Sequence, residues 1–293
     1  MKQSGPIEGV VERKAREGNG YRSGAGDRGL SAIVTKNLEG WINLNTQTTH
    51  EFAEGLEKVL NEAIRRGMFR SPVEIHIQNT LQESYEFFRK HFDDSILFCG
   101  YPYGSGDEAR DMRTYAIRQA MEQCDSEDLF LEFGVFRGSS INLFAEVLED
   151  RGLVIHGFDA FLGLGEDWTG HVSAPKGTYD RGGEVPDVRS NVRLHVGWVN
   201  DTVPDFLRVH NTKSIAFLHM DMDTYTPTTF VLSQVKPRLR AGAIILFDQL
   251  YGVPSWREHE YRALTERFSE REFEYIAFSR QQVAVRYLGT EAS

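Results

Sequence analysis

The stretch Leu129-Phe-Leu-Glu-Phe-Gly-Val-Phe-Arg-Gly-Ser-Ser140 is the most informative part of the 293-residue sequence. Its apolar start predicts a buried strand over Leu129–Phe133, and the residues Ser139–Glu149 have the pattern of a helix. Between them, Gly134 and Gly138 allow the backbone to approach a ligand closely, and the helix N-terminus offers free N–H groups. This order of elements is typical of a ligand site in an α/β fold, and a tight turn without a ligand is the alternative.

From residue 128 onward, predicted strands and helices alternate, which is the pattern of a parallel sheet with crossover helices. Two short alternating segments joined by Arg280-Gln-Gln282 predict an antiparallel hairpin at one edge of the sheet. The predicted strands are Leu129–Phe133, Val154–Asp159, Val192–Val196, Ser214–Met220, Ala243–Asp248, Phe273–Ser279 and Val283–Leu288. The predicted helices are Ser139–Glu149, Thr202–His210, Thr228–Leu239 and Trp256–Phe268.

The sequence before this domain is predicted to form an extension. Residues 1–28 are rich in Gly, Arg, Lys and Glu and poor in large apolar side chains, which predicts a flexible tail. Residues 29–106 are predicted to be mainly helical, and the main domain covers residues 107–293. The turn-rich stretch Gly100–Gly106 is either a plain connector or part of a lid. The elements predicted before and at the start of the domain are helices over Thr49–Gly67, Leu81–His91 and Asp107–Gln123, and a short strand over Val73–Ile77.

The composition argues against several classes of partner. The net charge is −10 and the sequence has no dense run of Lys and Arg, so we expect no binding to nucleic acid. Two cysteines, Cys99 and Cys124, are too few for a disulfide scaffold and fit the reducing cytoplasm. No run approaches the roughly 18 apolar residues of a membrane helix. We therefore expect a cytoplasmic protein without a membrane segment.

Candidate binding residues follow the predicted strands, because ligands of open parallel sheets lie beyond the carboxyl ends of the strands. Glu132 suits a ligand with an ammonium group, and Asp159 can accept hydrogen bonds from a ribose diol. Trp198 could cover an adenine ring and Asp201 could accept from its amino group, with an apolar contact and a helix cap as the alternatives. Together they favour an adenosine-containing cofactor. The predicted cofactor-binding residues are Glu132, Phe133, Gly134, Val135, Ser139, Ser140, Asp159, Phe161, Gly197, Trp198, Asp201 and Asp221.

Further acidic residues follow the fourth and fifth predicted strands. The side chains of Asp221, Asp248 and Gln249 could converge on Mg²⁺, with helix capping as the alternative. Such a cation would lower the pKa of a bound substrate hydroxyl. His219 and His259 lie near these strand ends, so either could act as a general base, with a structural role as the alternative. The candidate catalytic residues are Asp221 and His259.

Taken together, five blocks over about residues 128–250 resemble the macrocin/mycinamicin O-methyltransferase family in order and spacing. The resemblance implies a class I methyltransferase fold, which is a Rossmann-like α/β fold with a seven-stranded sheet. It also implies S-adenosylmethionine and Mg²⁺ as cofactors, and a sugar hydroxyl of a natural product as methyl acceptor. By position, Asp221 corresponds to the family's metal ligand and base, and Asp248 to its second ligand. The blocks are Glu132-Phe-Gly-Val-Phe-Arg-Gly138, Gly157-Phe-Asp-Ala-Phe-Leu-Gly-Leu164, Gly197-Trp-Val-Asn-Asp-Thr-Val-Pro204, His219-Met-Asp-Met-Asp-Thr-Tyr225 and Leu239-Arg-Ala-Gly-Ala-Ile-Ile-Leu-Phe-Asp248.

Two features depart from the family. The family usually has paired aspartates after the fifth strand, whereas this chain has Asp248-Gln249; the more distant catechol O-methyltransferase has Asp-Asn there. The segment before residue 100 matches poorly, although N-terminal elements of such enzymes help to form the acceptor pocket and subunit contacts. We expect a small-molecule hydroxyl acceptor and a homo-oligomer.

Two other functions stay open at this point. One is a nicotinamide-dependent oxidoreductase, which the missing three-glycine fingerprint and the terminal hairpin disfavour. The other is a catalytically silent cofactor-binding or scaffold protein, which Gln249 and the unmatched N-terminal segment make conceivable.

Overall fold

The computed structural model describes residues 54–55, 58–59, 62, 72–92, 95–98, 107–169 and 174–289. The chain divides into two units, Met1–Pro72 and Val73–Ser293. In the first unit, the described residues before Pro72 are helical and fall within the predicted helix Thr49–Gly67. The predicted tail over residues 1–28 and the turn-rich stretch Gly100–Gly106 lie outside the described residues.

The helix α3, over Pro72–His91, replaces two predicted elements. The predicted strand over Val73–Ile77 is wrong, and the helix begins about two turns before the predicted Leu81. Proline at the first helical position favours this early start, since its fixed φ suits a helix and its missing N–H costs nothing there. The buried side chains Thr80, Ser84 and Phe87 recur at the spacing of one helical face, whereas Ile75 and Ile77 are exposed.

The core of the second unit is an eight-stranded sheet with the order β1-β7-β8-β6-β5-β2-β3-β4. The strands β2 to β6 run parallel, and β8 is antiparallel to both β6 and β7. The predicted hairpin is confirmed but its edge position is wrong, because the two-residue strand β1 pairs outside β7. The strands are β1 (Ile96–Leu97), β2 (Leu129–Phe133), β3 (Ile155–Asp159), β4 (Val192–Val196), β5 (Ile215–Met220), β6 (Leu239–Phe247), β7 (Phe273–Phe278) and β8 (Val283–Tyr287).

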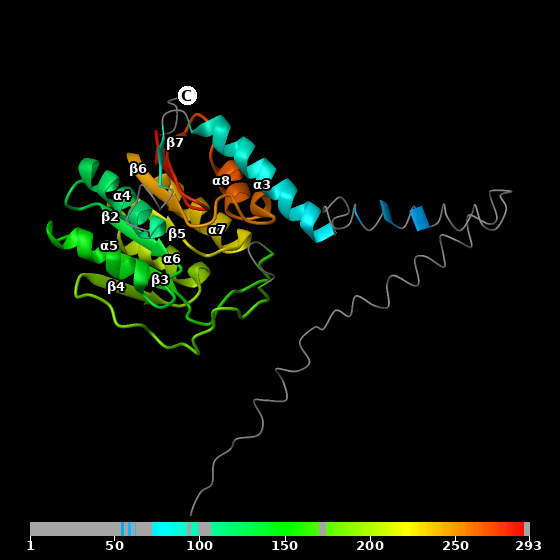
Figure 1. Ribbon diagram of the computed structural model, residues 1–293. Helices are drawn as coiled ribbons and strands as arrows, with labels where there is room; N and C mark the ends of the chain where they lie inside the picture. The colour runs from blue at the N-terminus through cyan, green and yellow to red at the C-terminus, as the bar shows by residue number, and fades with distance from the viewer. Residues whose placement is uncertain are drawn as a thin grey trace, which may run out of the picture. The chain divides into compact units, whose positions relative to one another are not determined.

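Helices cover both faces of this sheet (Figure 1). Alternate residues of each strand enter opposite cores: Phe130 and Phe217 pack with α4 and α5, whereas Leu131 and Leu218 pack with α6, α7, α8 and part of α3. None of the helices in the described part of the chain is long and apolar enough to cross a membrane. The helices are α4 (Glu108–Gln123), α5 (Ser139–Glu149), α6 (Val199–Val209), α7 (Tyr225–Val235) and α8 (Glu260–Arg267), with 3₁₀ turns over Lys236–Arg238 and Trp256–Glu258.

Most of these bounds agree with the predictions, and the differences have local causes. Both α6 and α7 begin about one turn earlier than predicted. Their N-cap residues are Trp198 and Thr224. The α7 segment tightens into a 3₁₀ turn before the predicted end at Leu239. Pro237 lies in that turn, and a proline within an α-helix would remove a backbone hydrogen bond.

The order of the strands reverses at β2, since β3 and β4 lie on one side of it and β5 and β6 on the other. In open α/β sheets, ligands bind at such a switch point. Here the backbones are very close: the N–H of Asp221 donates to the carbonyl of Phe133 at 2.9 Å. A Cβ atom on Gly134, whose φ is +91°, would lie 1.8 Å from the carbonyl oxygen of Asp221. Glycine is therefore required where β2 ends beside β5.

Replacing Gly134 with alanine should disrupt this junction. We expect Gly134→Ala to lower the free energy of unfolding by on the order of 4 kcal/mol, because strain and a backbone clash combine. Gly177→Ala is the matched control, since Gly177 also has a positive φ of +86° but open space around a Cβ. It should cost only about 1–2 kcal/mol. Denaturant unfolding measures both, and equal losses would contradict the close approach.

Candidate active site

A pocket opens at the carboxyl ends of β2 to β6 and brings together residues from all of these strand ends. It contains many of the predicted residues: Gly134, Asp159, Phe161, Gly197, Trp198, Asp221 and Gln249. It also contains residues that were not predicted: Phe136, Tyr179, Arg181, Met222, Asp223 and Thr224. Tyr179 and Arg181 come from the segment between β3 and β4, which carries no motif that could have identified them.

The carboxylate of Asp159 holds the turn that follows β2. Its Oδ2 accepts hydrogen bonds from the backbone N–H groups of Val135 and Phe136, both at 2.8 Å, and its Oδ1 accepts from Phe161 at 2.7 Å. A carboxylate has about four acceptor sites, so it can still accept a bond from a ligand. Asp159 therefore shapes the pocket wall and keeps the capacity for its predicted role.

The pocket residues also fit an adenosine cofactor. The N-cap of α5 is Gly138, which offers no side-chain acceptor to the N–H groups of the first turn. The Trp198 side chain is 42% exposed and lines the pocket, so an aromatic face is available to a ring. With the carboxylate of Asp159 beside them, these groups could hold S-adenosylmethionine.

Several predicted residues lie outside the pocket lining. Glu132 is fully buried beneath the pocket, where its Oε1 accepts from the Ser140 hydroxyl at 2.5 Å. The Nε2 atom of His259 lies 3.3 Å from the Thr169 hydroxyl, and burial lowers the pKa of this histidine. Their predicted contacts with cofactor or substrate stay predictions, as do those of Phe133, Val135, Ser139, Ser140 and Asp201.

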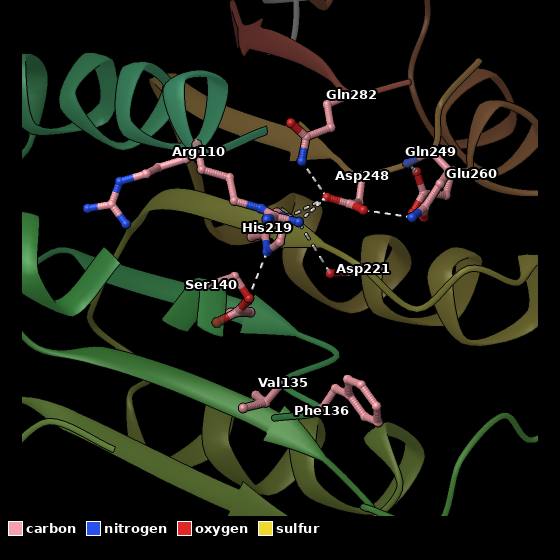
Figure 2. A network of polar contacts seen from close by, with 12 residues as sticks. Arg110, Val135, Phe136, Ser140, His219, Asp221, Asp248, Gln249, Glu260 and Gln282 are labelled. Carbon is pink, nitrogen blue, oxygen red and sulfur yellow. Dashed lines mark hydrogen bonds and ion pairs between the residues drawn. The ribbon is translucent and has the colours of Figure 1, made fainter. Parts of the chain in front are cut away.

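A buried histidine joins the strand ends below the pocket. His219 Nδ1 lies 2.9 Å from Glu132 Oε1, and its Nε2 lies 3.5 Å from Asp248 Oδ1 (Figure 2). Burial alone would lower the pKa of His219, but the contacts with Asp248 and Glu132 outweigh it and raise this pKa to about 9. A histidine that is protonated at neutral pH cannot accept a proton, so this environment does not support His219 as the general base.

Asp248 is surrounded by donors from the adjacent Gln249 and from two distant parts of the chain (Figure 2). Its Oδ1 accepts from Arg113 Nη2 at 2.6 Å and from Gln282 Nε2 at 2.5 Å, and its Oδ2 accepts from Gln249 Nε2 at 2.6 Å. Although burial would raise it, the pKa of Asp248 is lowered, because His219 and Arg113 stabilise the ionised carboxylate. Sequence reasoning missed Arg113 and Gln282, which belong to no motif.

Asp221 is one of three aspartates that line the pocket, together with Asp159 and Asp223. Burial and the neighbouring charge of Asp248 raise the pKa of Asp221 well above the ordinary value. The same two causes raise the pKa of Asp223 to about 7. A carboxyl group with a raised pKa that lines a pocket is a candidate for proton transfer.

His219, Asp221 and Asp248 each offer one ligand atom, and these atoms lie within 4.8 Å of one another, so the group could hold a metal ion. Mg²⁺ prefers octahedral oxygen ligands. Here one of the three is an imidazole, the oxygens of Asp248 are taken by donors, and the guanidinium of Arg113 lies against both aspartates. In this arrangement the donor set does not fit Mg²⁺.

Comparisons with known proteins identify the domain that carries this pocket. Residues 131–250 match a family model described as a methyltransferase domain. The chain is 40% identical over 73 residues to mycinamicin III 3''-O-methyltransferase of Micromonospora griseorubida, which covers 24% of this chain and 27% of that protein. It is 28% identical over 156 residues to the 8-demethyl-8-(2,3-dimethoxy-alpha-L-rhamnosyl)-tetracenomycin-C 4'-O-methyltransferase of Streptomyces olivaceus, covering 45% of this chain and 57% of that protein. The matches thus span less than two thirds of either relative.

The fold has a counterpart among solved structures. The calicheamicin methyltransferase CalS11 superposes with a TM-score of 0.51 at 21% identity, over 74% of this chain and 94% of that one. The five parallel strands and the antiparallel hairpin are those expected from the resemblance, whereas the two-residue strand β1 makes the sheet eight-stranded instead of seven-stranded. The chain therefore contains a match to a methyltransferase domain on the corresponding α/β fold, and it is similar to O-methyltransferases of the macrocin/mycinamicin type.

Proposed function

We propose that this chain transfers the methyl group of S-adenosylmethionine to a hydroxyl oxygen of a small natural product or of its sugar. The observation that carries the proposal is the pocket, in which Gly134, Asp159, Trp198 and Asp221 line one space. The relatives support the acceptor class, since one is named for mycinamicin III and the other for a rhamnosyl tetracenomycin.

In this proposal, the cofactor binds on the side of the pocket that is formed by the ends of β2, β3 and β4. S-adenosylmethionine supplies an electrophilic methyl group, and transfer breaks the methyl–sulfur bond and leaves S-adenosylhomocysteine. Asp159 accepts hydrogen bonds from the ribose, and Trp198 covers the adenine. The turn at Gly134 brings the backbone close to the ligand. The protein contributes alignment and the exclusion of water.

Asp221 is proposed as the base that accepts the proton of the acceptor hydroxyl. As the hydroxyl oxygen bonds to the methyl carbon, its proton passes to the carboxylate of Asp221 and then to solvent. Burial and the charge of Asp248 raise the pKa of Asp221, which makes its carboxylate a better proton acceptor. No step of this scheme uses Mg²⁺. The Mg²⁺ dependence that the resemblance implies is not part of the proposal, because the donors around Asp248 do not fit this ion.

The variant Asp221→Asn tests the assigned base. It should lower turnover by about 10²–10⁴-fold, because the amide cannot accept the proton. The affinity for S-adenosylhomocysteine should stay within a few-fold, as measured by calorimetry. Asp205→Asn is the control, because Asp205 lies on α6 with its side chain paired to Arg208 and outside the pocket lining. Full turnover of Asp221→Asn with a glycosylated acceptor would contradict the assignment.

The variant Trp198→Ala tests the cofactor site without any acceptor. Loss of the aromatic face should weaken the binding of S-adenosylhomocysteine by up to about tenfold in calorimetry. Val196→Ala is the matched control, because Val196 is also exposed near the end of β4 but does not line the pocket. NADH titrated in parallel should not bind. Tighter binding of NADH than of S-adenosylhomocysteine would instead favour an oxidoreductase.

A further inference from the structure

A guanidinium lies where the sequence predicts a divalent cation. Arg113 comes from α4, outside the five blocks of the resemblance, and its Nη2 lies 2.6 Å from Asp248 Oδ1 and 4.0 Å from Asp221 Oδ2. Its side chain is 21% exposed, and a guanidinium keeps its positive charge in proteins. One fixed cation therefore already lies against both predicted aspartate ligands.

The carboxylate of Asp248 has little room for a second cation. Arg113 and Gln282 donate to its Oδ1, and Gln249 donates to its Oδ2. A metal ion bound there would displace at least one of these donors. It would also lie close to the positive charge of Arg113, which repels it.

The neutral amide at Gln249 is consistent with a guanidinium, instead of a divalent cation, beside the two aspartates. Its Nε2 donates to Asp248, and its Oε1 is buried without a hydrogen-bond partner in the structure. The family that the sequence resembles usually has a second aspartate at this position. A divalent cation with three carboxylates and a guanidinium with two carboxylates carry the same net charge. The change from Asp to Gln therefore offsets the change from a divalent cation to Arg113.

We propose that Arg113 takes the place of the divalent cation in this chain, as a positioning residue that fixes Asp248 and orients the carboxylate of Asp221. Methyl transfer then requires no added metal. The catalytic part of this inference rests on the proposed function, whereas the occupation of the cation position by Arg113 does not. Arg113 does not line the pocket, so it acts through the aspartates and not on the substrate.

A titration with Mn²⁺ tests the inference without donor or acceptor, so its outcome is separate from that of the methyltransferase assay. The electron paramagnetic resonance signal of free Mn²⁺ is followed with the full-length protein. The wild type should show no saturable site up to about 1 mM Mn²⁺. Arg113→Met should gain a saturable site, because the aspartates lose the positive charge of Arg113. This site should bind Mn²⁺ at least about tenfold more tightly than the limit of about 1 mM set for the wild type.

Four further variants define the site. Arg113→Lys keeps a positive charge and should resemble the wild type, and so should Arg110→Met, which changes an exposed arginine about one turn away on α4. Arg113→Met/Asp248→Asn should lose the gained site. Circular dichroism checks that each variant is folded. A saturable Mn²⁺ site in the wild type that Asp248→Asn removes would overturn the inference. So would a folded Arg113→Met protein that binds Mn²⁺ no better than the wild type.

Discussion

The carboxyl edge of the sheet depends on the buried contact between His219 and the carboxylates of Glu132 and Asp248. Buried charges are costly unless they are paired, so each group fixes the position of the others. The contact joins β2, β5 and the end of β6, and the Ser140 hydroxyl adds the start of α5 to it. Because these ends are held together, the turn at Gly134 and the carboxyl group of Asp221 meet at the floor of one pocket.

This arrangement separates the polar groups into two layers. Asp221, Asp223 and Gln249 line the pocket, where a ligand can reach them. Asp248 and Arg113 lie behind them, where Arg113 contacts Asp221 and Asp248 accepts a hydrogen bond from Gln249. Aspartates after β5 and β6 can therefore surround either a metal ion or a guanidinium group. The choice depends on a side chain from α4 that this sequence pattern does not contain.

The sheet and the pocket could be predicted because their signals are local. Apolar runs that end at Gly134, Asp159 and Asp221 predict that these residues lie at one edge of a parallel sheet. This prediction does not depend on the sequence elsewhere in the chain. The prediction of a strand over Val73–Ile77 was wrong, because an alternating pattern of only five residues also occurs within helices. The contact of Glu132 with His219 could not be predicted. His219 is 87 residues away from Glu132, and no local pattern says whether a carboxylate faces a ligand or another side chain.

The most direct test of the account is the crystal structure of the complex with S-adenosylhomocysteine. The account predicts the adenine against Trp198, the ribose at Asp159 and the sulfur facing Asp221. A ligand bound elsewhere, or one whose sulfur faces away from Asp221, would contradict both the cofactor site and the assigned base.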